Sequence, residues 1–142
     1  MSLQQYMRPD SGLLRVRATG KFSLEEAQRT FLEMMEAVAL HKTERVLFDG
    51  RTITGNPRTM ERFYYGEFAA TTVAQYRERG MSPVTRFAYV LREPVRDPKK
   101  FGETVAVNRW MRLKVFDNLE EALEWLGPDS AGKAWGEVRR EK

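Results

Sequence analysis

The fold is decided by residues 45–55, which read Arg45-Val46-Leu47-Phe48-Asp49-Gly50-Arg51-Thr52-Ile53-Thr54-Gly55. A short apolar run ends abruptly there in an acid, a glycine and a hydroxyl-rich segment. This pattern is typical of a buried strand of an α/β sheet that delivers a loop to the rim, where ligands and partners bind. We therefore expect a strand over residues 45–49 and a loop from residue 50 to residue 58.

Strand and helix patterns alternate on either side of this stretch. A turn signal over residues 9–12 precedes a partly alternating strand at 13–19. Tyr6 and Met7 could form the other arm of a hairpin. Ser23 and Glu26 then predict a capping box, in which the serine accepts from a helix amide and the glutamate reaches back. The downstream patterns predict helices over 24–41 and 59–79, followed by a strand over 84–91. A helix capped by Asp97 should then run to about residue 109. The last predicted elements are a strand over 113–116 and a helix that is capped by Asn118 and ends at Leu126.

This order predicts a single α/β domain over residues 1–128, with a mixed, mostly parallel sheet, an opening hairpin and four helices. The last residues, 129–142, are mostly polar or small, and we expect them to form a tail. Trp110 and Met111, at the end of the third helix, are expected to close the core; the alternative is that they extend a partner interface or a ligand pocket formed by the aromatics of the second helix.

The amino-acid composition excludes several classes of site and partner. The chain has 142 residues, a net charge of +4, one histidine and no cysteine. Disulfides, thiolate catalysis and cysteine metal sites are therefore excluded, and no metal or cofactor is expected. The start of the chain does not resemble a signal peptide, and no apolar stretch is long enough to span a bilayer, so we expect a cytoplasmic protein without membrane insertion. No basic stripe with interleaved aromatics suggests a nucleic-acid partner.

Three segments together carry a family resemblance. They are residues 15–23 (RVRATGKFS), 45–51 (RVLFDGR) and 115–126 (VFDNLEEALEWL). Their order and spacing resemble the SpoIIAA-like proteins, relatives of the STAS domain of sulfate transporters and anti-sigma factor antagonists. The resemblance implies a compact α/β domain with helices largely on one side of the sheet.

The resemblance also implies a regulatory role through protein contacts. In the anti-sigma antagonist branch, a serine in an Asp-Ser-Ser-Gly motif after the matching strand is phosphorylated by a partner kinase. Here the segment from Asp49 lacks that serine pair, and the only hydroxyls nearby belong to Thr52, Thr54 and Thr59.

Two groups of residues are candidates for a binding site. The first group follows the predicted strand over residues 45–49, where an arginine and loop amides could hold an anion or a partner. The alternative is that Asp49 and Arg51 pair with one another. The second is a set of aromatics on the helix over 59–79 that one buried face cannot accommodate. The candidate residues are Asp49, Arg51, Thr52, Thr54, Phe63, Tyr64, Tyr65 and Phe68.

We therefore predict a non-enzymatic binding or regulatory module that contacts a protein partner or a second copy of itself as a homodimer. The alternative is a small carrier that holds an apolar or lipid-like molecule between the second helix and the sheet. A third reading is an enzyme that uses Asp49 and Asp117 as a carboxylate pair. These three readings stay open at the level of sequence.

Overall fold

The computed structural model describes residues 2–127, so the predicted tail over 129–142 lies outside the described residues. The elements are β1 (Gln4–Asp10), β2 (Leu13–Lys21), α1 (Leu24–His41), β3 (Arg45–Thr54), α2 (Thr59–Glu78), β4 (Arg86–Val90), α3 (Phe101–Asn108), β5 (Leu113–Phe116) and α4 (Leu119–Leu126). The five strands form one sheet in the order β1-β2-β3-β4-β5. β1 runs antiparallel to β2, and the other neighbours are parallel, which confirms the predicted mixed sheet.

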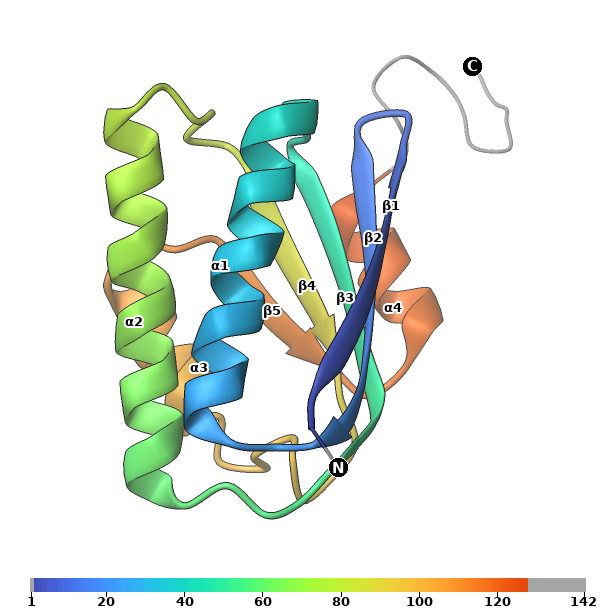
Figure 1. Cartoon of the computed structure of the whole chain (residues 1–142), viewed down its shortest axis with the longest axis vertical. Helices are drawn as coiled ribbons and strands as arrows, with labels where there is room; N and C mark the ends of the chain where they lie inside the picture. The colour runs from blue at the N-terminus through green and yellow to red at the C-terminus, as the bar shows by residue number, and fades with distance from the viewer. Residues whose placement is uncertain (1, 128–142) are drawn as a thin grey trace.

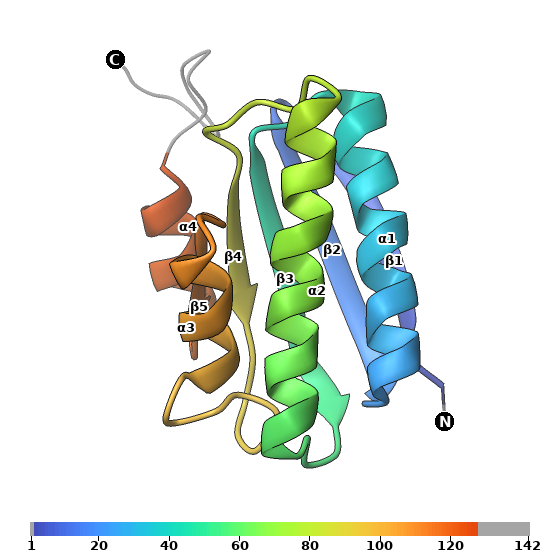
Figure 2. The same cartoon turned by 90° about the vertical axis from the view of Figure 1, so that its left-hand side faces the viewer.

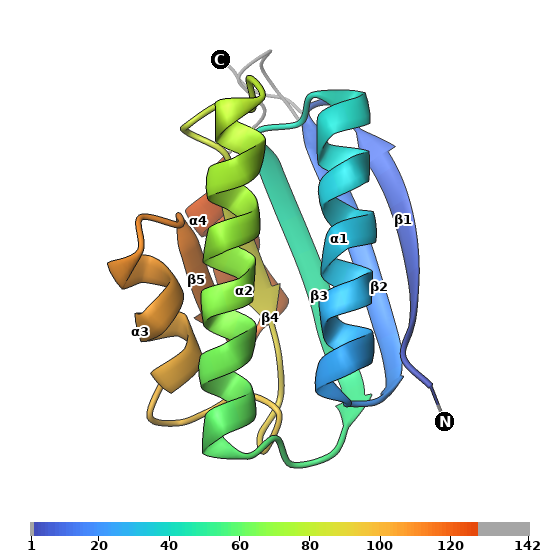
Figure 3. The ribbon, with the colours of Figure 1, turned by 60° about the vertical axis from the view of Figure 1, so that its left-hand side comes forward.

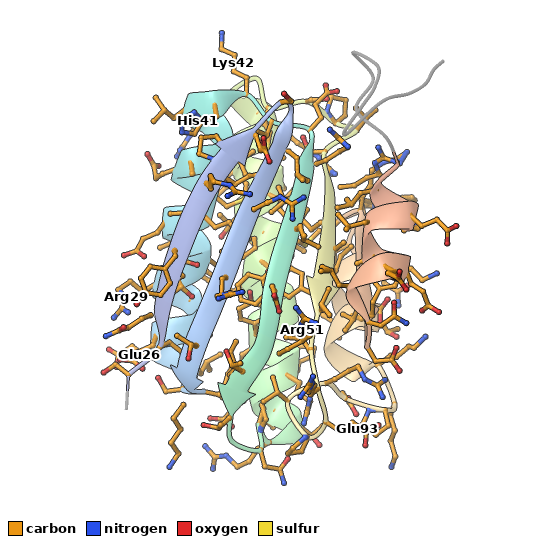
Figure 4. The ribbon with its side chains drawn as sticks, turned by 90° about the vertical axis from the view of Figure 1, so that its right-hand side faces the viewer. Glu26, Arg29, His41, Lys42, Arg51 and Glu93 are labelled. Atoms are coloured by element: carbon orange, nitrogen blue, oxygen red, sulfur yellow. The ribbon has the colours of Figure 1, made fainter. Side chains whose placement is uncertain are left out.

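The helices lie unequally on the two faces of the sheet (Figure 1). α1 and α2 cover one face, with α3 beside α2 and next to β5 (Figures 2 and 3). The core under these helices includes Phe31, Met35, Val46 and Phe87. α4 packs on the other face through a smaller core that includes Leu47 and Leu126. Figure 4 looks onto this second face, where no described helix covers β1 and β2.

The opening hairpin forms as predicted. Asp10 pairs with Leu13, so the turn consists of two residues only, Ser11 and Gly12. Both have positive φ angles, 44° and 81°. Such turns match the twist of the flanking strands, which explains why a glycine stands at the second position.

The start of α1 differs in one respect from the predicted capping box. Ser23 Oγ accepts a hydrogen bond from the Glu26 backbone N–H at 3.2 Å, as expected. The Glu26 carboxylate, however, accepts from the backbone N–H of Leu3 at 3.0 Å. The glutamate therefore links the N-terminal segment to α1, and the hydrogen bond from Leu3 holds the pKa of the Glu26 carboxyl below its usual value.

β3 is longer than the sequence predicts. It continues to Thr54 instead of ending at Asp49, so residues 50–54 of the expected loop belong to the strand, and residues 55–58 form the connection to α2. The cause is β2, whose nine residues offer backbone partners as far as Lys21. A register shift lets the three steps of β3 from Asp49 to Thr52 span the two steps of β2 from Arg17 to Thr19. A β-bulge of this kind absorbs one extra residue and lets pairing continue.

α3 begins later than the sequence predicts. It starts at Phe101, with Lys100 as its N-cap, and not at the Asp97-Pro98 pair. Asp97 Oδ1 accepts from the Lys99 N–H at 3.0 Å, and the Lys100 N–H donates to the Asp97 carbonyl at 2.9 Å. Asp97 therefore closes a local turn, a conformation that competes with helix initiation.

Candidate functional site

The first group of candidate residues lies on the face of β3 that points away from α1 and α2. Phe48 belongs to the helix-side core, and side chains alternate along a strand, so Asp49 points to the opposite face. Arg51 Nε and Nη2 each donate to the Asp49 carboxylate at 2.9 Å, and the Arg51 N–H donates to it at 3.2 Å. Figure 4 shows Arg51 on this open face of the sheet. The arginine and its hydrogen bonds hold the pKa of the Asp49 carboxyl below its usual value.

This ion pair corresponds to one of the two alternatives for the first group, in which Asp49 and Arg51 bind each other and not an anion or a partner. It also bears on the alternative that Asp49 and Asp117 form a catalytic carboxylate pair. Asp117 is exposed and directly precedes Asn118, whose side chain caps α4 by accepting from the Glu121 N–H at 2.8 Å. With its carboxylate bound to Arg51, Asp49 is not poised to act with Asp117 as an acid–base pair.

The threonines of the first group are exposed on β3. The Thr52 hydroxyl donates to the Ala18 carbonyl and the Thr54 hydroxyl to the Gly20 carbonyl, each at 3.4 Å. These hydroxyls therefore stabilise the pairing of β3 with β2, and both threonines lie in the strand and not in a loop.

The aromatics of α2 divide into an inner and an outer pair. Tyr65 and Phe68 pack edge-on against Phe31 of α1, with ring centroids 6.0 and 6.3 Å apart. Tyr64 is 46% exposed, and Phe63 is half-buried between Tyr64 and the guanidinium of Arg109. One face of α2 therefore does not hold all four rings, as predicted. The structure places these rings and the Asp49–Arg51 pair on opposite sides of the sheet, so the eight candidate residues do not form one site.

Trp110 corrects the expectation that both residues after α3 close the core. Met111 is buried, at 2% exposure, but Trp110 is 83% exposed. The Trp110 backbone has a φ of 71°, in the left-handed region, and Arg77 Nη1 donates to its carbonyl at 2.9 Å. A helix end breaks the helical period, so sequence spacing does not fix the direction of a side chain there. The left-handed backbone conformation at Trp110 sets the direction in which its side chain points.

A cavity of about 130 Å³ lies between α2 and the sheet. Its wall is mostly apolar, and it includes residues of both sheet and helices: Phe48, Ile53, Tyr65, Tyr89, Leu91 and Ala106. Of these residues, only Tyr65 was predicted from the sequence as a candidate for a binding site. The helical period of α2 identifies one wall, whereas the opposite wall depends on which strands lie beneath that helix.

Few polar groups line this cavity. The hydroxyls of Tyr65 and Tyr89 lie 2.7 Å apart and share a hydrogen bond. Burial raises the pKa of both tyrosines well above the usual value, so both hydroxyls stay protonated. Arg62 donates to the carbonyls of Pro57, Pro94 and Val95 at 3.2, 2.6 and 2.8 Å, which fixes the loop before α3. Glu103 Oε2 accepts from the Val115 N–H at 3.2 Å.

Residues 2–127, the described part of the chain, contain no cluster of three or more histidine, cysteine or acidic side chains placed to hold a metal ion. No helix within that part of the chain has the length and apolar character to cross a membrane.

The sequence and the fold of this chain are similar to those of known proteins. The family model described as SpoIIAA-like matches residues 13–127. An anti-sigma factor antagonist from Mycobacterium paratuberculosis shares 15% identity and a TM-score of 0.56, over 88% of this chain and 94% of that one. An uncharacterized protein with a SpoIIAA-like fold from Shewanella loihica shares 17% identity and a TM-score of 0.44, over 88% and 93%. No curated protein matches the chain. The family match spans most of the chain and every helix of the described residues, and so this chain belongs to the SpoIIAA-like family.

Proposed function

We propose that this protein is a non-enzymatic regulatory module that acts through protein–protein contacts, with a second copy of itself as one partner. Its fold is shared with an anti-sigma factor antagonist, a protein whose name describes action against another protein. Because the chain has no cysteine, a reducing compartment suits it, and we infer the cytoplasm as its place of action. The proposal needs no phosphorylated serine in the segment after Asp49.

The observation that carries the proposal is the exposure of Trp110. Tryptophan is enriched among the residues that dominate binding energy, and a lone solvated indole leaves a large apolar area in water. The Arg77 hydrogen bond and the left-handed turn fix the position of the Trp110 backbone. A fixed backbone has less conformational freedom to lose on binding than a mobile one.

Other exposed apolar side chains on the same pair of helices support an interface. α2 and α3 pack closely, and Met60 and Tyr64 of α2, Val107 of α3 and Trp110 just after α3 are 44–83% exposed. We propose that these four residues form one contact region, called here the α2–α3 surface. Methionine, tyrosine and tryptophan are the types enriched in protein interfaces. We infer that the α2–α3 surface is the contact with the second copy.

Sedimentation velocity of the full chain tests this proposal. Trp110→Ala is expected to weaken self-association about 30-fold, which corresponds to the roughly 2 kcal/mol typical of an interface hot spot. Leu40→Ala is the matched control, because Leu40 is 75% exposed in the last turn of α1, outside the α2–α3 surface. Equal dissociation constants for the wild type and the Trp110 variant would reject the proposed contact.

A second candidate function is favoured by the cavity under α2. This is the small-carrier reading, in which an apolar molecule lies between the second helix and the sheet. The volume of about 130 Å³ is below the roughly 300 Å³ of common drug-sized sites. It suits a single ring better than an acyl chain. Native mass spectrometry of freshly purified protein should then show a bound species of low mass.

A further inference from the structure

We propose that the cavity under α2 binds a neutral organic molecule of about the size of benzene that carries a hydrogen-bond acceptor. This inference deepens the second candidate function and rests on it. It follows from three properties of the cavity: its size, its one spare donor and its balance of charge.

The size of the cavity sets the size of the ligand. An engineered apolar cavity of about 150 Å³ takes up benzene, and the cavity here measures about 130 Å³. Gly50 helps to keep this space open, because a Cβ at that position would lie 2.8–2.9 Å from the side chains of Leu91, Ile53 and Phe48. All three of those side chains line the cavity.

The tyrosine pair supplies a spare donor. In a pair of hydroxyls 2.7 Å apart, one donates and the other accepts, and the accepting hydroxyl keeps its own proton. Neither hydroxyl makes another hydrogen bond within residues 2–127. Both tyrosines line the cavity, and we place this proton within reach of an acceptor bound inside it. A buried donor without a partner is unfavourable, which gives a ligand with an acceptor oxygen an advantage over a purely apolar one.

The charges around the cavity favour a neutral ligand. Arg62 and Lys100 contribute two positive charges, and Asp97 and Glu103 contribute two negative ones. Three backbone carbonyls already engage the guanidinium of Arg62. Glu103 Oε1 is buried and has no partner among the described residues, so it would repel a carboxylate placed beside it.

Two matched pairs of probes test the inference by calorimetric titration of the full chain. Phenol and toluene have nearly the same shape, but only phenol carries a hydroxyl, which can accept a hydrogen bond and can also donate one; benzamide and benzoate differ in charge. We expect phenol to bind about two- to tenfold more tightly than toluene, the range of one hydrogen bond, and benzamide more tightly than benzoate.

The double substitution Tyr65→Phe and Tyr89→Phe should abolish the preference for phenol. Removing both partners of a hydrogen bond leaves no unsatisfied group, so the fold should persist, and thermal unfolding checks this. Tyr64→Phe is the matched control, since this neighbouring tyrosine does not line the cavity.

The outcomes distinguish failure of the carrier function from failure of the proposed ligand class. If no probe binds, the carrier function itself is rejected. If toluene binds as tightly as phenol, or benzoate as tightly as benzamide, the ligand class is wrong and a carrier of another class remains. A preference for phenol that survives in the double variant would show that the tyrosine pair is not its source.

Discussion

Asp49 and Arg51 form an ion pair that is partly shielded on the open face of the sheet. Their side chains are 17% and 32% exposed. The pKa of Asp49 is lowered first of all by the hydrogen bonds from the Arg51 side chain, and the nearby charge of Arg17 acts in the same direction. Because the ionised carboxylate is favoured in the folded state, the pair contributes stability that depends on pH.

Asp49→Asn should lower the free energy of unfolding by up to about 1 kcal/mol at pH 7, the upper range for a solvent-screened pair. The folded pKa lies below the unfolded value near 4, so the contribution is complete above that value and is lost as the pH falls through the folded pKa. The difference between the wild type and the variant should therefore shrink on acidification below about pH 4. Urea unfolding at pH 7 and at pH 3 measures it.

Asp117→Asn is the matched control, because its exposed carboxylate makes no hydrogen bond within the described part of the chain. We expect its effect at pH 7 to stay within about 0.5 kcal/mol. An Asp49→Asn protein as stable as the wild type at pH 7 would contradict the assigned role of the ion pair.

The close approach of α2 and α3 depends on two glycines, Gly66 and Gly102. A Cβ on Gly66 would lie 2.6 Å from the carbonyl oxygen of Gly102, and a Cβ on Gly102 would lie 3.1 Å from the carbonyl oxygen of Arg62. Since the obstructing atoms belong to the backbone, a whole helix must shift to make room. The position of α3, and therefore of Trp110, rests on this crossing.

Gly66→Ala should destabilise the protein by about 1–2 kcal/mol. Overpacking costs about 1–3 kcal/mol, and it outweighs the gain of up to about 1 kcal/mol that alanine gives in a helix. Thr71→Ala, on the exposed side of α2, is the control and should stay within about 0.5 kcal/mol. Urea unfolding compares the two, and a Gly66→Ala protein more stable than the wild type would show that the helices can separate freely.

Elements with local signals are predictable from the sequence, and elements that depend on distant partners are less so. α1 and α4 begin at Ser23 and Asn118, whose side chains cap the first turn as their residue types predict. The end of β3 depends on the length of β2, more than thirty residues upstream. The start of α3 depends on whether Asp97 caps a helix or closes a turn, and both are ordinary roles for aspartate.

At the scale of the whole molecule, the excess of aromatics on α2 is visible in the sequence. A cavity lies between α2 and the sheet, and the ligand that the carrier alternative places there stays a prediction. The direction of Trp110 and the pairing of Tyr65 with Tyr89 were not predictable. The first depends on a left-handed turn, and the second brings together residues 24 positions apart.

Sedimentation equilibrium of the wild-type chain, at loading concentrations from about 1 to 200 μM, tests the central claim of self-association most directly. The α2–α3 surface predicts a reversible monomer–dimer equilibrium, with a weight-average mass that rises from 16.6 kDa toward twice that value. A mass that stays at 16.6 kDa over the whole range would contradict the claim.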